Sequence, residues 1–107
     1  MPVDTTKPLK ELSAEEITFL CYNKYIEFSD HALAYIETGE RKVFITQDII
    51  SLLEKQKPSK AYLQQNGRYG IYYRLREGYR KLVLEIQEQK VIIVTYMDTD
   101  EIPKIRL

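Results

Sequence analysis

The stretch from Asn66 to Met97, NGRYGIYYRLREGYRKLVLEIQEQKVIIVTYM, decides the fold. Tyr, Ile, Val and Leu are dense in it, which is typical of β-strands. Asn66-Gly67 is a strong signal for a two-residue hairpin turn, Glu77-Gly78 is a weaker one, and Glu88-Gln89 is weaker still. The pattern predicts a four-stranded antiparallel meander, with strands over 61–65, 68–76, 79–87 and 90–97.

The residues before this meander carry the signals of helices. Ser13 and Glu16 have the spacing of a capping box. This box predicts an extra N-terminal helix within 11–24, after a loose arm over 1–10. The segment 25–28, YIEF, is compatible with a short strand or with an extended linker.

Two further helices are predicted between these elements. Ser29 or Asp30 can cap a helix that runs to Thr38. Thr46 is the predicted N-cap of a third helix, which ends before Pro58. Helices first and hairpins afterwards predict an α+β domain, with N-terminal helices packed on one face of a four-stranded antiparallel sheet.

Composition limits the class of protein. A length of 107 residues points to a single domain over 1–107, and the 16 basic residues balance the 16 acidic ones. The single Cys excludes an internal disulfide framework, and one Cys with one His gives no zinc spacing. No apolar run has the roughly 18 residues of a membrane span, and the N-terminus lacks the apolar core of a signal peptide. We expect a soluble, cytoplasmic protein that uses neither a metal nor a cofactor.

The charge is unevenly distributed along the chain. Residues 1–40 contain three basic and eight acidic side chains, whereas residues 57–81 contain seven basic side chains and one acidic. Five of the nine tyrosines lie in the same basic window. This asymmetry is more informative than the net charge of zero, which by itself argues against a protein that coats nucleic acid.

The hairpin turns set which side chains are neighbours. With two-residue turns at the second and third turn signals, one face of the sheet is an apolar core face that gathers Ile71, Tyr73, Leu82, Leu84, Ile86, Val91 and Ile93. On the opposite face, Arg74, Lys81 and Tyr96 fall in one row across three strands, beside Tyr72. Two adjacent cations can bind a phosphate, and the tyrosines can stack on a base. The same charges are also compatible with an ordinary solvated face.

Two isolated residues have chemical potential outside the sheet. His31, the only histidine, lies at a predicted helix start and can act as a general base or bind a substrate oxygen. The alternative for His31 is a helix-start residue bonded to the backbone. Cys21 lies on the apolar face of the first helix, which favours a buried inert thiol over a nucleophile.

Three segments carry a resemblance to a known family: residues 28–33, FSDHAL; residues 44–53, FITQDIISLL; and residues 91–96, VIIVTY. They resemble a small-domain family of uncharacterised function that is related to the RelE-like and BrnT-like toxins of toxin–antitoxin pairs. The resemblance covers 25–97 and implies a RelE-like core, followed by a tail over 98–107. It also implies a sheet that carries basic residues and a late-strand Tyr for RNA cleavage.

The resemblance is carried over residue by residue. His31 matches the family's helix-start His, and Thr95-Tyr96 matches the end of its last strand, whereas Arg74 and Lys81 match only by general position. The chain departs from the family at Tyr35 and at Gly39, where the family usually has Arg.

These observations predict a RelE/BrnT-like toxin domain that either only binds RNA or also cleaves it, without a metal, as an endoribonuclease; the sequence leaves open whether the domain is an enzyme. The ribose 2′-OH would attack the adjacent phosphate; Arg74 and Lys81 would stabilise the developing charge, and Tyr96 or His31 would serve as acid or base. The expected catalytic residues are His31, Arg74, Lys81 and Tyr96. The expected RNA-binding residues are Tyr72, Arg76, Arg68 and Arg80. The alternative function is a non-catalytic protein-interaction module, and the candidate partners are RNA, an antitoxin protein and a second copy joined through the tyrosine-rich face.

Overall fold

A computed structural model of the chain describes residues 7–36 and 41–102. It contains six strands and three helices within these ranges. In chain order these elements are β1 (Pro8–Leu12), α1 (Ala14–Cys21), β2 (Tyr25–Phe28), α2 (Asp30–Ile36), α3 (Arg41–Lys55), β3 (Lys60–Gln64), β4 (Tyr69–Arg74), β5 (Tyr79–Ile86) and β6 (Lys90–Thr99). None of the described helices is long and apolar enough to cross a membrane.

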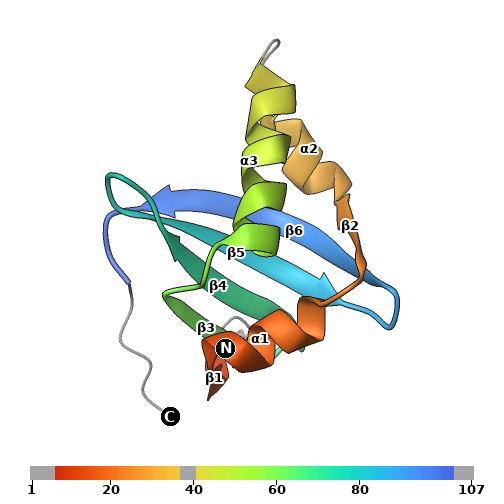
Figure 1. Cartoon of the computed structure of the whole chain (residues 1–107), viewed down its shortest axis with the longest axis vertical. Coiled ribbons are helices and arrows are strands. Elements are labelled where there is room, and N and C mark those ends of the chain that lie inside the picture. Colours follow the sequence, from red (N-terminus) through yellow and green to blue (C-terminus); the bar gives the residue numbers. More distant parts are fainter. Residues whose placement is uncertain (1–6, 37–40, 103–107) are drawn as a thin grey trace, which may run out of the picture.

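The strands form one mixed sheet in the order β1-β3-β4-β5-β6-β2 (Figure 1). The meander β3–β6 is antiparallel, β1 adds to β3 in the antiparallel direction, and β2 pairs with β6 in the parallel direction. The expected four-stranded antiparallel sheet is therefore wrong. The meander is present, but one strand from the N-terminal region flanks it on each side.

Strand β1 corrects the expected loose arm from Pro8 onward, and residues 1–6 of that arm lie outside the described part. Leu12 lies opposite Ala61 of β3, and Lys10 lies opposite Leu63. Pro8 is tolerated because β1 is an edge strand, where a missing N–H need not remove a ladder hydrogen bond. Strand β1 is only five residues long and pairs with a segment some fifty positions away, so its own sequence gives little signal of a strand.

The first two helices begin as their sequences predict. The N–H of Glu16 donates to Ser13 Oγ and the N–H of Ser13 donates to Glu16 Oε1, both at 3.1 Å, which completes the capping box of α1. Ser29, rather than Asp30, caps α2, because its Oγ accepts the N–H of Ala32 at 3.0 Å. The predicted end of this helix near Thr38 lies outside the described residues.

The third helix begins at Arg41, so Thr46 lies inside it, and the prediction that Thr46 is an N-cap is wrong. Ile45 packs against the core one turn before Ile49 and two turns before Leu52. This spacing places all three side chains on one face of the helix. Burial of that face outweighs the strand preference of the β-branched and aromatic residues at 43–45.

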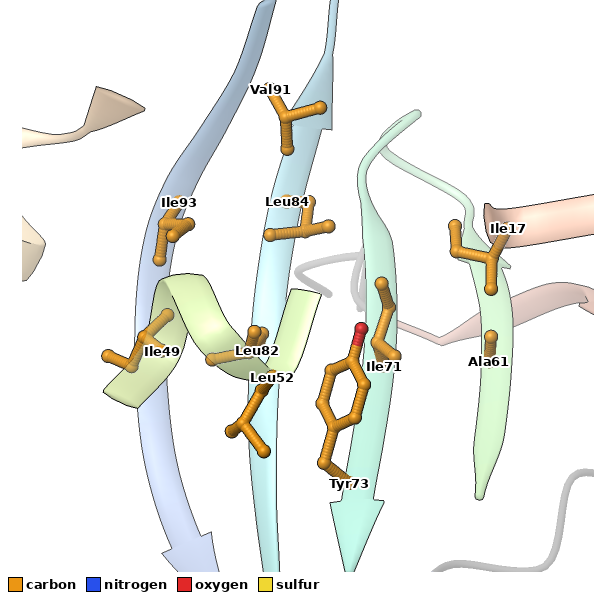
Figure 2. Packing of buried hydrophobic residues seen from close by; sticks show 10 residues of the cluster. All are labelled: Ile17, Ile49, Leu52, Ala61, Ile71, Tyr73, Leu82, Leu84, Val91 and Ile93. Carbon is orange, nitrogen blue, oxygen red and sulfur yellow. The ribbon is translucent and has the colours of Figure 1, made fainter. Parts of the chain in front are cut away.

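The core lies between one face of the sheet and helices α1 and α3. Ile49 of α3 lies over β6, Leu52 of α3 lies over β5, and Ile17 of α1 lies over β3 (Figure 2). Six of the predicted core-face residues are buried here and Ile86 packs against them, so the predicted core face is confirmed. Helix α2 contacts β6 and α3 instead of lying across the sheet, which corrects the prediction that all helices pack on one face.

Candidate functional site

The hairpin between β4 and β5 closes earlier than the sequence predicts. The N–H of Leu75 donates to the carbonyl of Gly78 at 3.0 Å, so the two-residue loop precedes Gly78 instead of including it. Gly78 has φ +81° and follows the loop. As a result, Arg74 lies opposite Tyr79 instead of Lys81. The register moves by an even number of residues, so each side chain keeps its predicted face.

A β-bulge in β6 reverses the predicted orientation of Tyr96. Leu84 lies opposite Ile93, as predicted, but the preceding residue of β5 lies opposite Thr95, so β6 carries one extra residue. Beyond the bulge, Tyr96 lies opposite Leu82 and packs against the core. Tyr96 therefore belongs to the helix-covered face.

The four expected catalytic residues consequently lie on two sides of the sheet. Arg74 and Lys81 are on the face away from the core, and the predicted row of Arg74, Lys81 and Tyr96 is wrong. His31 is exposed in the first turn of α2, beside β6. A general acid or base acts from within about 3 Å of the proton it transfers, or through one water. The structure brings neither His31 nor Tyr96 to the two cations.

The expected RNA-binding residues are also distributed over different surfaces. Arg80 points to the core side, where its Nε donates to Oδ1 of Asp98 at 2.8 Å. Arg76 is exposed in the β4–β5 turn, and Arg68 is half-buried just before β4. Tyr72 lies on the face away from the core but is only 5% exposed, so its ring is not available for stacking on a base.

Two tyrosines and a lysine form a compact cluster on this face, which we call the tyrosine platform (Tyr62, Tyr72 and Lys81). The ring centroids of Tyr62 and Tyr72 are 6.3 Å apart, and Nζ of Lys81 lies 5.8 and 5.6 Å from them. Gly70 lies opposite Tyr62, and an added Cβ there would lie 2.6 Å from Cζ of the tyrosine. The glycine therefore allows the ring to cross β4.

Three cations, Lys60, Arg74 and Lys81, surround the platform. We call this side of the sheet the open face, and we define it by these three cations and by Tyr62 and Tyr72 between them. Lys60 and Lys81 lie on either side of Tyr72 in the pairing register. Arg74 is a diagonal neighbour of Lys81, with Cα atoms about 7–8 Å apart in such a pair. The guanidinium of Arg74 lies 5.9 Å from the ring centroid of Tyr79.

The open face holds positive charge over neutral rings. Burial raises the pKa of Tyr72, and the neighbouring Tyr62 raises it further by repulsion and a hydrogen bond, so the ring stays protonated. Within residues 7–36 and 41–102, neither Arg74 nor Lys81 forms an ion pair. Lys60 forms an ion pair with Glu11 of β1 at 3.9 Å. Because such a surface pair contributes little free energy, a phosphate can replace the carboxylate at small cost.

Lys60 and Tyr62 are the site residues that the sequence does not predict. The Asn66-Gly67 hairpin has three loop residues, because the N–H of Gln64 donates to the carbonyl of Arg68. A two-residue loop would have placed Tyr62 opposite a core residue. An odd change of register transfers every side chain of the strand to the other face.

A second surface feature lies on the helix side. A groove of about 680 Å³ lies between α1 and the end of α3, and Leu53 lines it. Phe19 and Tyr22 of α1 border this groove and are 78% and 76% exposed. None of the residues expected to catalyse or bind RNA lines it. Exposed aromatic side chains beside a groove are typical of a protein-contact surface.

No protein-family model, curated protein or solved structure matches this chain. The resemblance to RelE-like toxins therefore rests on the sequence segments quoted above. In the part of the chain that the structure describes, no three His, Cys, Asp or Glu side chains are grouped so that they could hold a metal ion. The open face is thus the surface on which the predicted functional residues Tyr72, Arg74 and Lys81 remain together.

Proposed function

We propose that the chain binds RNA through the open face, by contacts between its cations and the phosphate backbone. The observation that carries this proposal is the grouping of Lys60, Arg74 and Lys81 around the tyrosine platform. A basic patch on one face is the electrostatic feature of nucleic-acid binding, even in a chain of zero net charge. Because Tyr62 and Tyr72 are buried, base stacking contributes little, and the interaction is largely independent of sequence.

The proposal concerns binding and not cleavage by the predicted set of residues. A toxin of the RelE-like class remains compatible with the sequence segments that resemble that family. Cleavage by 2′-OH attack, however, needs an acid and a base next to the cations that stabilise the phosphate. His31 and Tyr96 do not lie beside Arg74 and Lys81 in this fold.

The test is fluorescence anisotropy with a labelled 12-mer of single-stranded oligouridylate in 50 to 200 mM KCl. Three cations on a single strand predict a slope of about −2 for log K against log salt, so affinity falls about 20-fold over this range. The variant Lys60→Gln/Arg74→Gln/Lys81→Gln should lose both the affinity and the slope. A matched variant, Lys10→Gln/Lys55→Gln/Lys57→Gln, removes three exposed positive charges elsewhere and should bind like wild type.

Equal losses in both triple variants would show that total charge, and not the open face, determines binding. The same 12-mer made of DNA tests whether the ribose contributes. Incubation of the RNA with the protein tests cleavage, which we do not expect. If RNA is cleaved and Arg74→Gln abolishes the cleavage, the open face is catalytic and the proposal of binding alone is wrong.

A second candidate function is a non-catalytic protein-interaction module. The specific observation in its favour is the exposure of Phe19 and Tyr22 beside the α1–α3 groove. Growth after induced expression in a bacterial host separates the two candidates. An effect on growth that requires Phe19 but not Arg74, tested with Phe19→Asp and Arg74→Gln, would favour the interaction module.

A further inference from the structure

The outer edge of β6 is paired over only part of its length. Strand β2 pairs with Lys90–Ile93, at one end of the ten-residue strand β6 (Figure 1). Ser29 extends this contact, because its N–H donates to the carbonyl of Ile93 at 2.9 Å and its Oγ donates to that of Val94 at 2.7 Å. Beyond Val94, no strand among the described residues pairs with β6 on this side.

The register shows which backbone groups point outward at this edge. The N–H of Gln87 donates to the carbonyl of Lys90, so the backbone polar groups of Gln87 point towards β6. Because this direction alternates along a strand, the N–H and C=O groups of every odd-numbered residue of β5 point towards β6. Their partners beyond the bulge, including Met97, direct their N–H and C=O groups back to β5. Tyr96 and Asp98 therefore direct their N–H and C=O groups away from the sheet.

We propose that this edge pairs with the same edge of a second copy of the chain, antiparallel and about a two-fold axis at Met97. Tyr96 of each copy then lies opposite Asp98 of the other, and the four outward N–H groups meet the four outward C=O groups. The result is one continuous sheet of two copies. The axis is perpendicular to the sheet, so both open faces point the same way.

Length and charge select this register. Pairing about Met97 uses all of Thr95–Thr99, whereas the neighbouring in-phase registers, centred on Tyr96 or on Asp98, overlap over only three residues. The register centred on Asp98 also brings two carboxylates directly opposite each other, which is unfavourable. In the register about Met97, the Met97 side chain, 53% exposed in the single chain, lies next to its copy on the open face.

The opposite edge of the sheet is protected in a way that the β6 edge is not. Strand β1 carries Pro8 and an irregularity in its register between Pro8 and Lys10. Both features hinder the addition of a further strand. The segment Thr95–Thr99 contains no proline, and the bulge of β6 lies before it.

Five residues per strand give a small interface, well under the roughly 1,600 Å² of a typical stable complex. Association is therefore expected only at high protein concentration. The test is sedimentation equilibrium of the full chain, without RNA, from about 10 µM to 1 mM. The apparent mass should rise from 12.7 kDa towards twice that value as concentration increases.

Two variants test the interface itself. Met97→Asp places two carboxylates at the axis, and Leu9→Asp is its matched control, because Leu9 is 56% exposed on β1. Asp98→Pro removes an outward N–H that β5 does not use, and Asp98→Asn retains that N–H while removing the charge. Met97→Asp and Asp98→Pro should weaken association at least tenfold. The two controls, Leu9→Asp and Asp98→Asn, should associate like wild type. Thermal unfolding checks that each variant folds.

The proposal is overturned if wild type stays monomeric at 1 mM, if Met97→Asp dimerises normally, or if Leu9→Asp abolishes association. Because the Met97 side chain is exposed, Met97→Asp remains a valid test even if Asp98→Pro does not fold. The measurement contains no RNA. Failure of the dimer therefore leaves the RNA-binding proposal standing, and failure of RNA binding leaves the dimer untouched.

Discussion

Replacement of Ser29 by Ala should destabilise the fold more than replacement of Ser13, the residue that caps α1. Its Oγ accepts the N–H of Ala32 at 3.0 Å and donates to the carbonyl of Val94 at 2.7 Å, 65 residues away. One hydroxyl thus caps α2 and joins that helix to the bulge of β6. Loss of this group breaks both connections.

The magnitude follows from the two hydrogen bonds. Loss of a Ser N-cap costs about 1 kcal/mol. A part-buried carbonyl left without its partner costs about 1 kcal/mol more. We therefore expect Ser29→Ala to lower the free energy of unfolding by about 2 kcal/mol, which is roughly 8–16 °C in Tm for a domain of this size.

Urea unfolding followed by circular dichroism measures this change, and Ser13→Ala is the matched control. Ser13 caps α1 at the exposed surface, and its hydroxyl makes only the contact with Glu16 in the described structure. Ser13→Ala should therefore cost about 1 kcal/mol or less. Equal effects of the two substitutions would show that the hydrogen bond from Ser29 to Val94 contributes nothing to stability.

Three further predictions concern single residues. Gln64 is 2% exposed, and its Oε1 has no hydrogen-bond partner among residues 7–36 and 41–102. Gln64→Met should therefore leave the urea midpoint unchanged or raise stability by up to about 1 kcal/mol, and a loss above about 1 kcal/mol contradicts this. Gly78 has φ +81°, and an added Cβ would lie 2.6 Å from the Thr99 carbonyl oxygen, so Gly78→Ala should cost at least about 2 kcal/mol in the same assay. Burial raises the pKa of Cys21 to about 11, so a thiol reagent at pH 8 should label it at least about tenfold more slowly than a free cysteine, with labelling accelerating as pH rises towards that pKa. Because the pKa of Cys21 in the folded state lies above its unfolded value near 9, this thiol stabilises the folded state below pH 9. That stabilisation is lost as the pH rises from about 9 towards 11.

The meander could be predicted because its signals are local. The loop at Glu88-Gln89 has two residues as predicted, and the β5–β6 register near it is correct. The β4–β5 register is wrong because Gly78 marks a positive φ without showing whether it lies inside the loop or after it. The face on which each side chain of that hairpin lies was nevertheless predicted correctly, because the register differs from the predicted one by two residues.

The parts of the site that the sequence could not predict depend on non-local geometry. Tyr96 changes face because of a single bulge, and Tyr62 because of one extra loop residue. Strand β1 has five residues and β2 has four, and their pairing partners lie far away in the chain. Their pairing is determined by the completed sheet and not by their own sequence.

A two-dimensional amide spectrum of the ¹⁵N-labelled full chain locates the RNA-binding surface directly. The labelled protein is titrated with the oligouridylate 12-mer in 50 mM KCl. If RNA binds at the open face, the amide signals that shift are those around Lys60, Arg74 and Lys81, while those of Phe19 and Tyr22 stay in place. Shifts centred on the α1–α3 groove, or an unchanged spectrum at about 1 mM RNA, would contradict RNA binding at the open face.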